Sequence, residues 1–184
     1  MSRQKRHSEF YRQQLDSFLT YSGTTDTESI ALWVGCPDCG WIDARLVIGD
    51  DSFFINFSDA YPPFLDLVDW ITRITKGEDV GPVWVYDEIR DHFFNVNCTE
   101  KENVLRFEYA RFYFPGVGVF RKSFVKRTEL VSAFYLAFKY LMAIDFEAAE
   151  ERDDSSVWFH FDDDSDDLVK FDLSEIEAYL QDSH

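Results

Sequence analysis

Short apolar runs alternate with turn-forming residues along the chain, and this alternation constrains the fold more than any other feature. In the first half, three runs of strand length cover Ile30 to Val34, Trp41 to Ile48 and Phe53 to Phe57. They are separated by Cys36-Pro-Asp-Cys-Gly40 and by Gly49-Asp-Asp51, which both favour turns. Runs of this length joined by such turns predict an antiparallel meander.

A second group of strand-like runs follows, again separated by polar turns. The runs are Val83 to Tyr86, His92 to Cys98, Val104 to Tyr109 and Val117 to Val125. We expect neighbouring runs of this group to pair antiparallel. The pattern does not decide whether the two groups form one sheet or two.

Two longer segments have helical periodicity. Pro62 to Lys76 carries prolines that suit a first turn, and Thr128 to Phe146 places its apolar residues on one face. We expect Ser58 or Asp59 to cap the first helix and Thr128 to cap the second. The sequence therefore predicts an α+β fold in which two longer helices cover a mainly antiparallel sheet.

The amino-terminal segment combines a basic arm with an amphipathic pattern. From Ser8 to Leu19, apolar side chains recur at helical spacing among Arg and Gln. They are Phe10, Tyr11, Leu15, Phe18 and Leu19. We divide the chain into this arm and helix (1–20), an α+β core domain (21–146) and an acidic appendage (147–184).

Acidity is concentrated at the carboxyl end of the chain. Residues 145–184 hold fifteen Asp and Glu against two basic residues, which is −13 of the formal net charge of −17. A surface of this charge repels nucleic-acid phosphate and anionic lipid, and it attracts basic surfaces. Strand-like runs at Val157 to Phe161 and Leu168 to Phe171, then a helical segment from Ser174 to Leu180, predict a β-hairpin and helix packed on the core.

These features favour a non-enzymatic protein that binds a basic partner, in the manner of inhibitors and immunity proteins that occlude toxins or nucleic-acid-binding proteins. Acidic and aromatic residues of the appendage would form the binding surface. They are Asp153, Asp154, Trp158, Phe159, Asp162, Asp163, Asp164, Asp166 and Asp167. A DNA mimic would need carboxylates along a rod-like face, and a solubilising role would spread them over the whole surface.

A zinc-stabilised binding module is the main alternative. Two thiolates at the tip of a hairpin, Cys36 and Cys39, can share one tetrahedral zinc ion, and Cys36-Pro-Asp-Cys-Gly40 resembles one half of a zinc ribbon or rubredoxin-type knuckle. His92 and Cys98 lie on one face of a predicted strand and would complete the site if the hairpins meet. Otherwise Cys36 is a buried apolar residue beside a simple turn. A redox pair would need a helix running from Cys36, whereas Gly40 to Ile48 is expected to form a strand.

Catalytic motifs are missing. His92 and His160 are the histidines best placed to act as bases, and no Gly-x-Ser-x-Gly elbow, phosphate loop or dinucleotide fingerprint accompanies them. The run Asp162 to Asp167 lacks the Gly and Glu of a calcium-binding EF-hand. We therefore expect no enzyme activity and no cofactor other than the alternative zinc ion. An enzyme of unknown type that uses His92 or His160 with a carboxylate ranks below both binding alternatives.

The remaining expectations concern location and charge pairing. Three cysteines do not make a disulfide framework, and no apolar stretch suits a signal peptide or membrane span, so we expect a cytoplasmic protein that binds neither membrane nor nucleic acid directly.

This acidic chain also contains a basic cluster, and we expect the acidic appendage to pack partly against it. Its residues are Arg106, Arg111, Arg121, Lys122, Lys126 and Arg127.

Overall fold

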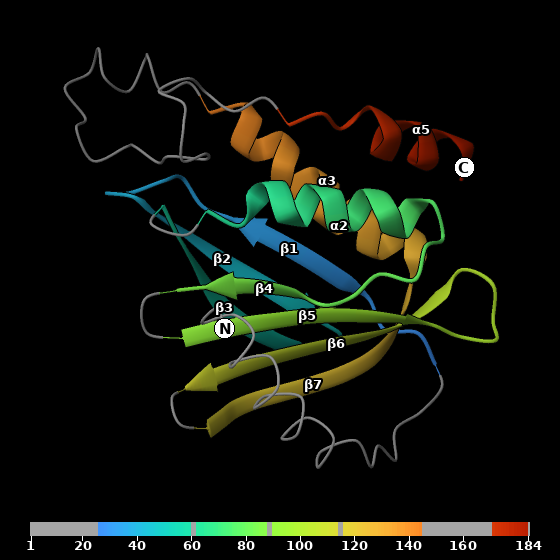
Figure 1. Cartoon of the computed structure of the whole chain (residues 1–184), viewed down its shortest axis with the longest axis horizontal. Helices are drawn as coiled ribbons and strands as arrows, with labels where there is room; N and C mark the ends of the chain where they lie inside the picture. Colours follow the sequence, from blue (N-terminus) through green and yellow to red (C-terminus); the bar gives the residue numbers. More distant parts are fainter. Residues whose placement is uncertain (1–25, 60–61, 88–89, 114–115, 145–170, 184) are drawn as a thin grey trace, which may run out of the picture.

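A computed structural model describes residues 26–59, 62–87, 90–113, 116–144 and 171–183. Within these ranges the chain forms two antiparallel sheets and three helices (Figure 1). The predicted α+β class is confirmed.

The first strand group forms a three-stranded sheet with the order β1-β2-β3. Its strands are β1 (Ile30–Val34), β2 (Trp41–Ile48) and β3 (Asp51–Ser58), so two of the three match the predicted bounds. Buried residues alternate with more accessible ones along β2, which shows that one face of this sheet lies on the core.

The second strand group forms a separate four-stranded sheet with the order β4-β5-β6-β7. Its strands are β4 (Val83–Tyr86), β5 (Arg90–Cys98), β6 (Val104–Tyr113) and β7 (Gly116–Lys126). The sheets meet at one edge, where Thr27 forms a parallel bridge with Phe124 of β7. The N–H of Glu28 donates to the carbonyl of Phe124 at 2.8 Å.

The helices α2 (Phe64–Thr75), α3 (Arg127–Met142) and α5 (Ser174–Asp182) lie together at one end of the sheets (Figure 1). All three helices were predicted, but the predicted side-chain caps are wrong. Pro63 and Lys126 occupy the N-cap positions, and neither makes a side-chain capping hydrogen bond. The physical reason at α3 is that β7 runs directly into the helix, which leaves Thr128 inside its first turn.

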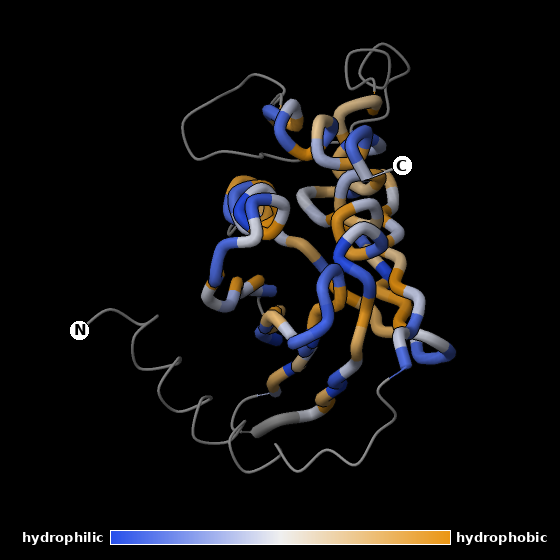
Figure 2. The backbone as a smooth tube through the Cα atoms, turned by 90° about the vertical axis from the view of Figure 1, so that its right-hand side faces the viewer, coloured by the Kyte–Doolittle hydropathy of each residue, from blue (hydrophilic) through white to orange (hydrophobic). Residues whose placement is uncertain are grey.

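The main core lies between the two sheets and beneath the helices. The rings of Phe53 in β3 and Tyr109 in β6 are 4.9 Å apart between centroids, and those of Phe94 in β5 and Phe134 in α3 are 6.1 Å apart. Figure 2 shows hydrophobic and hydrophilic positions alternating along the strands and helices, as expected for elements that bury one side.

Helix α5 is the described part of the predicted appendage, and it contacts both α2 and α3. Ile176 is fully buried, and Glu175 forms an ion pair with Lys76 at 2.6 Å. The hydroxyl of Tyr135 donates to Glu177 at 2.9 Å, and this hydrogen bond raises the pKa of the tyrosine. Apolar and polar contacts together therefore hold α5 against the helices of the core.

Candidate functional site

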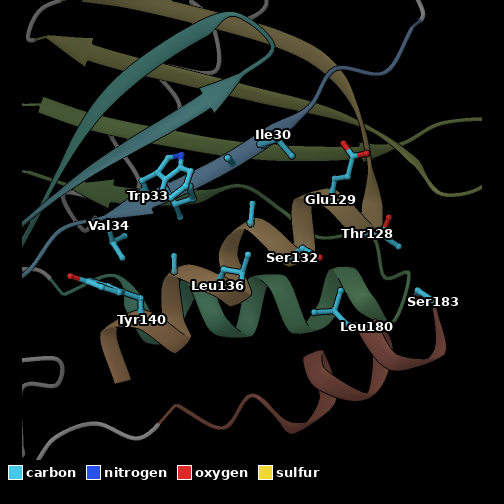
Figure 3. A pocket seen from close by; sticks show the side chains of 14 residues that line it. Ile30, Trp33, Val34, Thr128, Glu129, Ser132, Leu136, Tyr140, Leu180 and Ser183 are labelled. Carbon is cyan, nitrogen blue, oxygen red and sulfur yellow. The ribbon is translucent and has the colours of Figure 1, made fainter. Parts of the chain in front are cut away.

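A groove of about 670 Å³ lies between β1 and α3 and is the candidate functional site (Figure 3). Trp33 and Tyr140 lie at one end of it, and Thr128 and Glu129 lie at the other. All five residues of β1, seven residues of α3, Leu180 of α5 and Ser183, which follows α5, line the groove.

The groove is hollow because α3 presents small side chains along this side. Ser132, Ala133 and Ala137 line it, and Ala133 and Ala137 are also buried in the main core. The neighbouring side of α3 carries the large buried residues Leu130, Val131, Phe134, Phe138 and Leu141. The helix therefore packs against the core with both sets, and its residues Leu136 and Tyr140 stay exposed on the groove.

Large apolar side chains on the groove remain accessible to solvent. The exposed fractions are 67% for Trp33, 63% for Leu136 and 47% for Tyr140. Tryptophan and tyrosine are typical anchors of protein interfaces, because they bury a large area at a small cost in side-chain entropy. Their convergence on one groove makes it the candidate binding surface.

The backbone of β1 also faces the groove. The hydrogen bonds that join this strand to β2 include Gly49 N–H to Ser29 C=O and Gly35 N–H to Asp43 C=O. Because backbone groups alternate in direction along a strand, the N–H groups of Ile30, Leu32 and Val34 point to the outer edge. Within the described ranges, that edge pairs with another strand only through Thr27 and Glu28.

A row of side chains extends this surface over the outer face of the first sheet. Trp33 pairs across strands with Arg45, which in turn pairs with Phe54. The Arg45 guanidinium lies 4.8 Å from the centroid of the Phe54 ring, a cation–π contact. Trp33 is therefore shared between this row and the groove.

A second cluster of polar side chains lies inside the molecule, around His92. This histidine is fully buried, and its Nδ1 lies 3.1 Å from the Tyr109 hydroxyl. Its Nε2 lies 3.7 Å from Asp87 Oδ2, and Arg90 Nε donates to the same oxygen at 3.0 Å. Arg90 also donates to Asn56 Oδ1 of β3 at 2.9 Å, so the cluster links the two sheets.

Burial controls the charge state of this cluster. It lowers the pKa of His92, although the neighbouring Asp87 carboxylate opposes the shift, and it raises the pKa of Tyr109. Both residues are therefore neutral near pH 7. Because His92 is buried at the strand interface, its position suits a structural role better than that of a solvent-accessible base.

The predicted metal ligands are described, but they are not brought together. Cys36, Cys39 and Cys98 are exposed at the surface, whereas His92 is buried. No group of three or more His, Cys, Asp or Glu side chains is placed to hold a metal ion in the part of the chain that the structure describes. His92 and Cys98 do share one face of β5, but His92 lies in the core, whereas Cys98 ends the strand at the surface.

The cysteine segment forms a tight hairpin turn. The backbones of Asp38 and Trp41 exchange hydrogen bonds of 2.8 and 2.9 Å around Cys39 and Gly40. These two central residues have positive φ angles of 49° and 77°, as a two-residue type I′ turn requires. Strand β2 follows directly, so the segment is a turn and not the helix of a redox pair. The alternative that Cys36 is a buried apolar residue is wrong, because the turn holds Cys36 at the surface.

Two cationic side chains of the predicted basic cluster form ion pairs with carboxylates of the predicted core domain. Arg121 forms ion pairs with Glu28 and Asp51, and Lys126 forms one with Glu129 at 2.9 Å. The appendage residues named as partner-binding, together with His160, lie outside the described residues. Their predicted contacts with a partner or with this cluster stay predictions.

Sequence reasoning missed the groove, although two signals were present. Trp33 occupies an outward position in an alternating strand, and Ser132, Ala133 and Ala137 form a small-residue side on a helix that is otherwise rich in large residues. Neither signal states that β1 and α3 lie side by side.

None of the described helices is both long and apolar enough to cross a membrane. Comparisons of the chain with protein-family models, curated proteins and solved structures gave no match.

Proposed function

We propose that this protein binds another protein and that an extended segment of the partner lies in the groove between β1 and α3. In this proposal it acts by binding and not by catalysis, as a cytoplasmic inhibitor or immunity-type protein with a basic partner. The observation that carries the proposal is the set of exposed side chains, Trp33, Leu136 and Tyr140, along the edge of β1.

The dimensions of the groove fit a short extended segment. Five residues of β1 span about 17 Å at the usual rise of a strand. The α3 wall from Thr128 to Tyr140 spans about 18 Å at the usual rise of a helix. A partner segment of about five or six residues would therefore match both walls.

Strand addition supplies the main-chain part of the binding. The outward N–H groups of Ile30, Leu32 and Val34 would donate to carbonyls of the partner segment. Alternate side chains of that segment would face α3, where Leu136 and Tyr140 provide apolar contacts. Hydrogen bonds would give affinity, and the side-chain contacts would give specificity.

Charge favours a basic partner. The formal net charge of −17 attracts positively charged surfaces and accelerates their approach, and salt screens this attraction. The partner-binding residues predicted in 147–184 would act at this stage, and the groove would hold the partner after contact. If charge acts during approach and the groove acts after contact, the association rate should fall as the salt concentration rises. The dissociation rate should rise when Trp33 is replaced.

The test begins with the tagged full-length protein, purified from its own cells at low salt and analysed by native mass spectrometry. Binding of the copurified partner is then mapped by hydrogen exchange with single-residue resolution. We expect the amides of Ile30, Leu32 and Val34 to exchange quickly in the free protein and slowly in the complex. The amides of Ala31 and Trp33, which face β2, should be protected in both states.

A matched pair of variants locates the binding surface. Trp33→Ala should weaken binding by about 30-fold, because an aromatic anchor contributes about 2 kcal/mol or more. Leu65→Ala is the control, since Leu65 is an exposed apolar residue of α2 that does not line the groove. Equal affinity of the two variants, or unchanged exchange at Ile30, Leu32 and Val34 in the complex, would contradict the proposed site.

A further inference from the structure

The outer face of the four-stranded sheet carries a second apolar cluster, separate from the main core. Phe93, Ala110 and Phe112 form it, with exposed fractions of 6%, 0% and 1%, and Trp84 and Phe120 lie against it. The rings of Trp84 and Phe93 are 4.9 Å apart between centroids, and those of Trp84 and Phe112 are 5.6 Å apart. We call these five residues the outer aromatic face.

The elements of the described fold do not account for this burial. The first sheet and the helices pack against the other side of β4–β7, and Figure 1 shows no described helix or strand in front of these strands. Side chains stand out from a sheet, so neighbours within the same face cannot reduce a phenylalanine such as Phe112 to 1% exposure by themselves. A further layer must lie over this face.

The position of the chain ends points to one segment. Residues 1–25 lead directly into Thr27 and Glu28, which are bonded to Phe124 in β7, an edge strand of this sheet. Residues 145–170 instead run from the end of α3 to Phe171, whose ring lies 5.6 Å from that of Phe138 in the helical layer. Of these two segments, only the amino-terminal one joins the described chain beside the outer aromatic face.

The amino-terminal sequence also has the required pattern and length. The amphipathic stretch from Ser8 to Leu19 would measure about 18 Å as a helix, and four strands span about 15 Å across the sheet. The residues between Leu19 and Asp26 can bridge about 20 Å when extended. The segment can therefore cross the whole sheet from its β7 edge.

We propose that Ser8 to Leu19 of the same chain covers the outer aromatic face and presents Phe10, Tyr11, Leu15, Phe18 and Leu19 to it. The four-stranded sheet then lies between two apolar layers, the main core on one side and this segment on the other. This inference is independent of the groove and of its proposed partner.

A spin label placed on the segment tests the contact in the full-length protein. Cys36, Cys39 and Cys98 are exposed, so they are replaced by serine, and Gln13→Cys carries the label on the predicted polar side of the segment. We expect the indole N–H signal of Trp84 to broaden strongly. The indole signal of Trp33, on the outer face of the other sheet, should stay sharp.

Isotope mixing separates this contact from one between two molecules. A spin-labelled chain at natural abundance is mixed with a nitrogen-15 chain that carries no label, and the Trp84 signal is observed. The proposal is supported if the Trp84 signal stays sharp in the mixture but broadens in the sample whose chains carry both the spin label and nitrogen-15. Broadening in the mixture would show that the segment of a second copy covers the face. The absence of broadening in both samples would show that the segment does not lie on the face. Either result overturns the proposal.

A pair of substitutions gives an independent readout of the same contact. Phe18→Ala should raise the unfolding equilibrium constant by about 100-fold or more, as expected for loss of a buried phenylalanine. Gln13→Ala, on the predicted polar side, should change it by less than about threefold. Equal, small effects of the two substitutions would contradict burial of Phe18.

Discussion

The two sheets are both antiparallel meanders, but they differ in how many faces they bury. The three-stranded sheet places one face on the core, and its outer face carries the exposed residues Trp33 and Phe54. The four-stranded sheet is buried on both sides, with Phe94 and Tyr109 in the main core and Phe93 and Phe112 on the outer aromatic face.

The pattern of buried residues along the strands reflects this difference between the two sheets. In β2, buried positions alternate with more accessible ones, as expected for a sheet with one solvated face. In β5, His92, Phe93 and Phe94 are buried in succession, and in β6 four consecutive residues from Phe107 are buried. Consecutive burial therefore identifies the sheet that needs a layer on each side.

The sharpest test of this contrast compares one phenylalanine from each outer face. Phe112→Ala should lower the free energy of unfolding by about 3–5 kcal/mol, because it removes a buried ring and leaves a cavity. Phe54→Ala should cost less than about 1 kcal/mol, since it removes an exposed ring and one cation–π contact. Urea denaturation measures both, and similar losses would show that the two outer faces are not different environments.

A smaller effect is expected at the junction between the sheets. Arg121 of β7 forms ion pairs with Asp51 of β3 and with Glu28, and its side chain is only 23% exposed. Arg121→Met should lower the free energy of unfolding by about 1.5 kcal/mol, and high salt should narrow the difference from the wild type. Arg45→Met, in the first sheet alone, serves as the control and should cost less than about 1 kcal/mol. A greater loss for Arg45→Met would place the stronger contact within the first sheet.

The smallest expected effect depends on pH and concerns the inner face of the four-stranded sheet. Burial lowers the pKa of His92 in the folded state, so the unfolded chain takes up a proton first as pH falls. Stability should therefore decrease below about pH 6.5, by at most about 1 kcal/mol between pH 6.5 and 5.5.

A substitution isolates the histidine contribution to that decrease. His92→Gln keeps a polar partner for Tyr109 but does not titrate, so its stability should change less over the same pH interval. Urea denaturation at the two pH values gives the comparison. An identical pH dependence in both proteins would mean that the other titrating groups account for the decrease.

Much of the fold could be predicted from local pattern. The bounds of β1, β2 and β4 follow from apolar runs that end at turn residues. Prediction was less accurate where tertiary contacts decide. β6 extends past the predicted end at Tyr109 to Tyr113, beside the start of β7.

The candidate site could not be predicted in the same way, because it is made by two elements far apart in the sequence. Trp33 and Tyr140 line one groove because α3 packs along β1. The predicted metal ligands are not brought together for a related reason: local spacing fixed a shared strand for His92 and Cys98 but not their different depths. The spacing of residues along the sequence predicts a strand or helix well, but it does not predict which other strand or helix will pack against it.

The packing of β1 against α3 has a consequence for synthesis of the protein. Residues 30–34 leave the ribosome long before residues 127–142, by several seconds at about 5–20 residues per second. Each sheet is joined by hairpins and can form early from local contacts, whereas the inner face of the first sheet waits for the last long helix. The main core should therefore close only after α3 has arrived, α5 adds to it last, and the nascent protein is most prone to aggregate before α3 arrives.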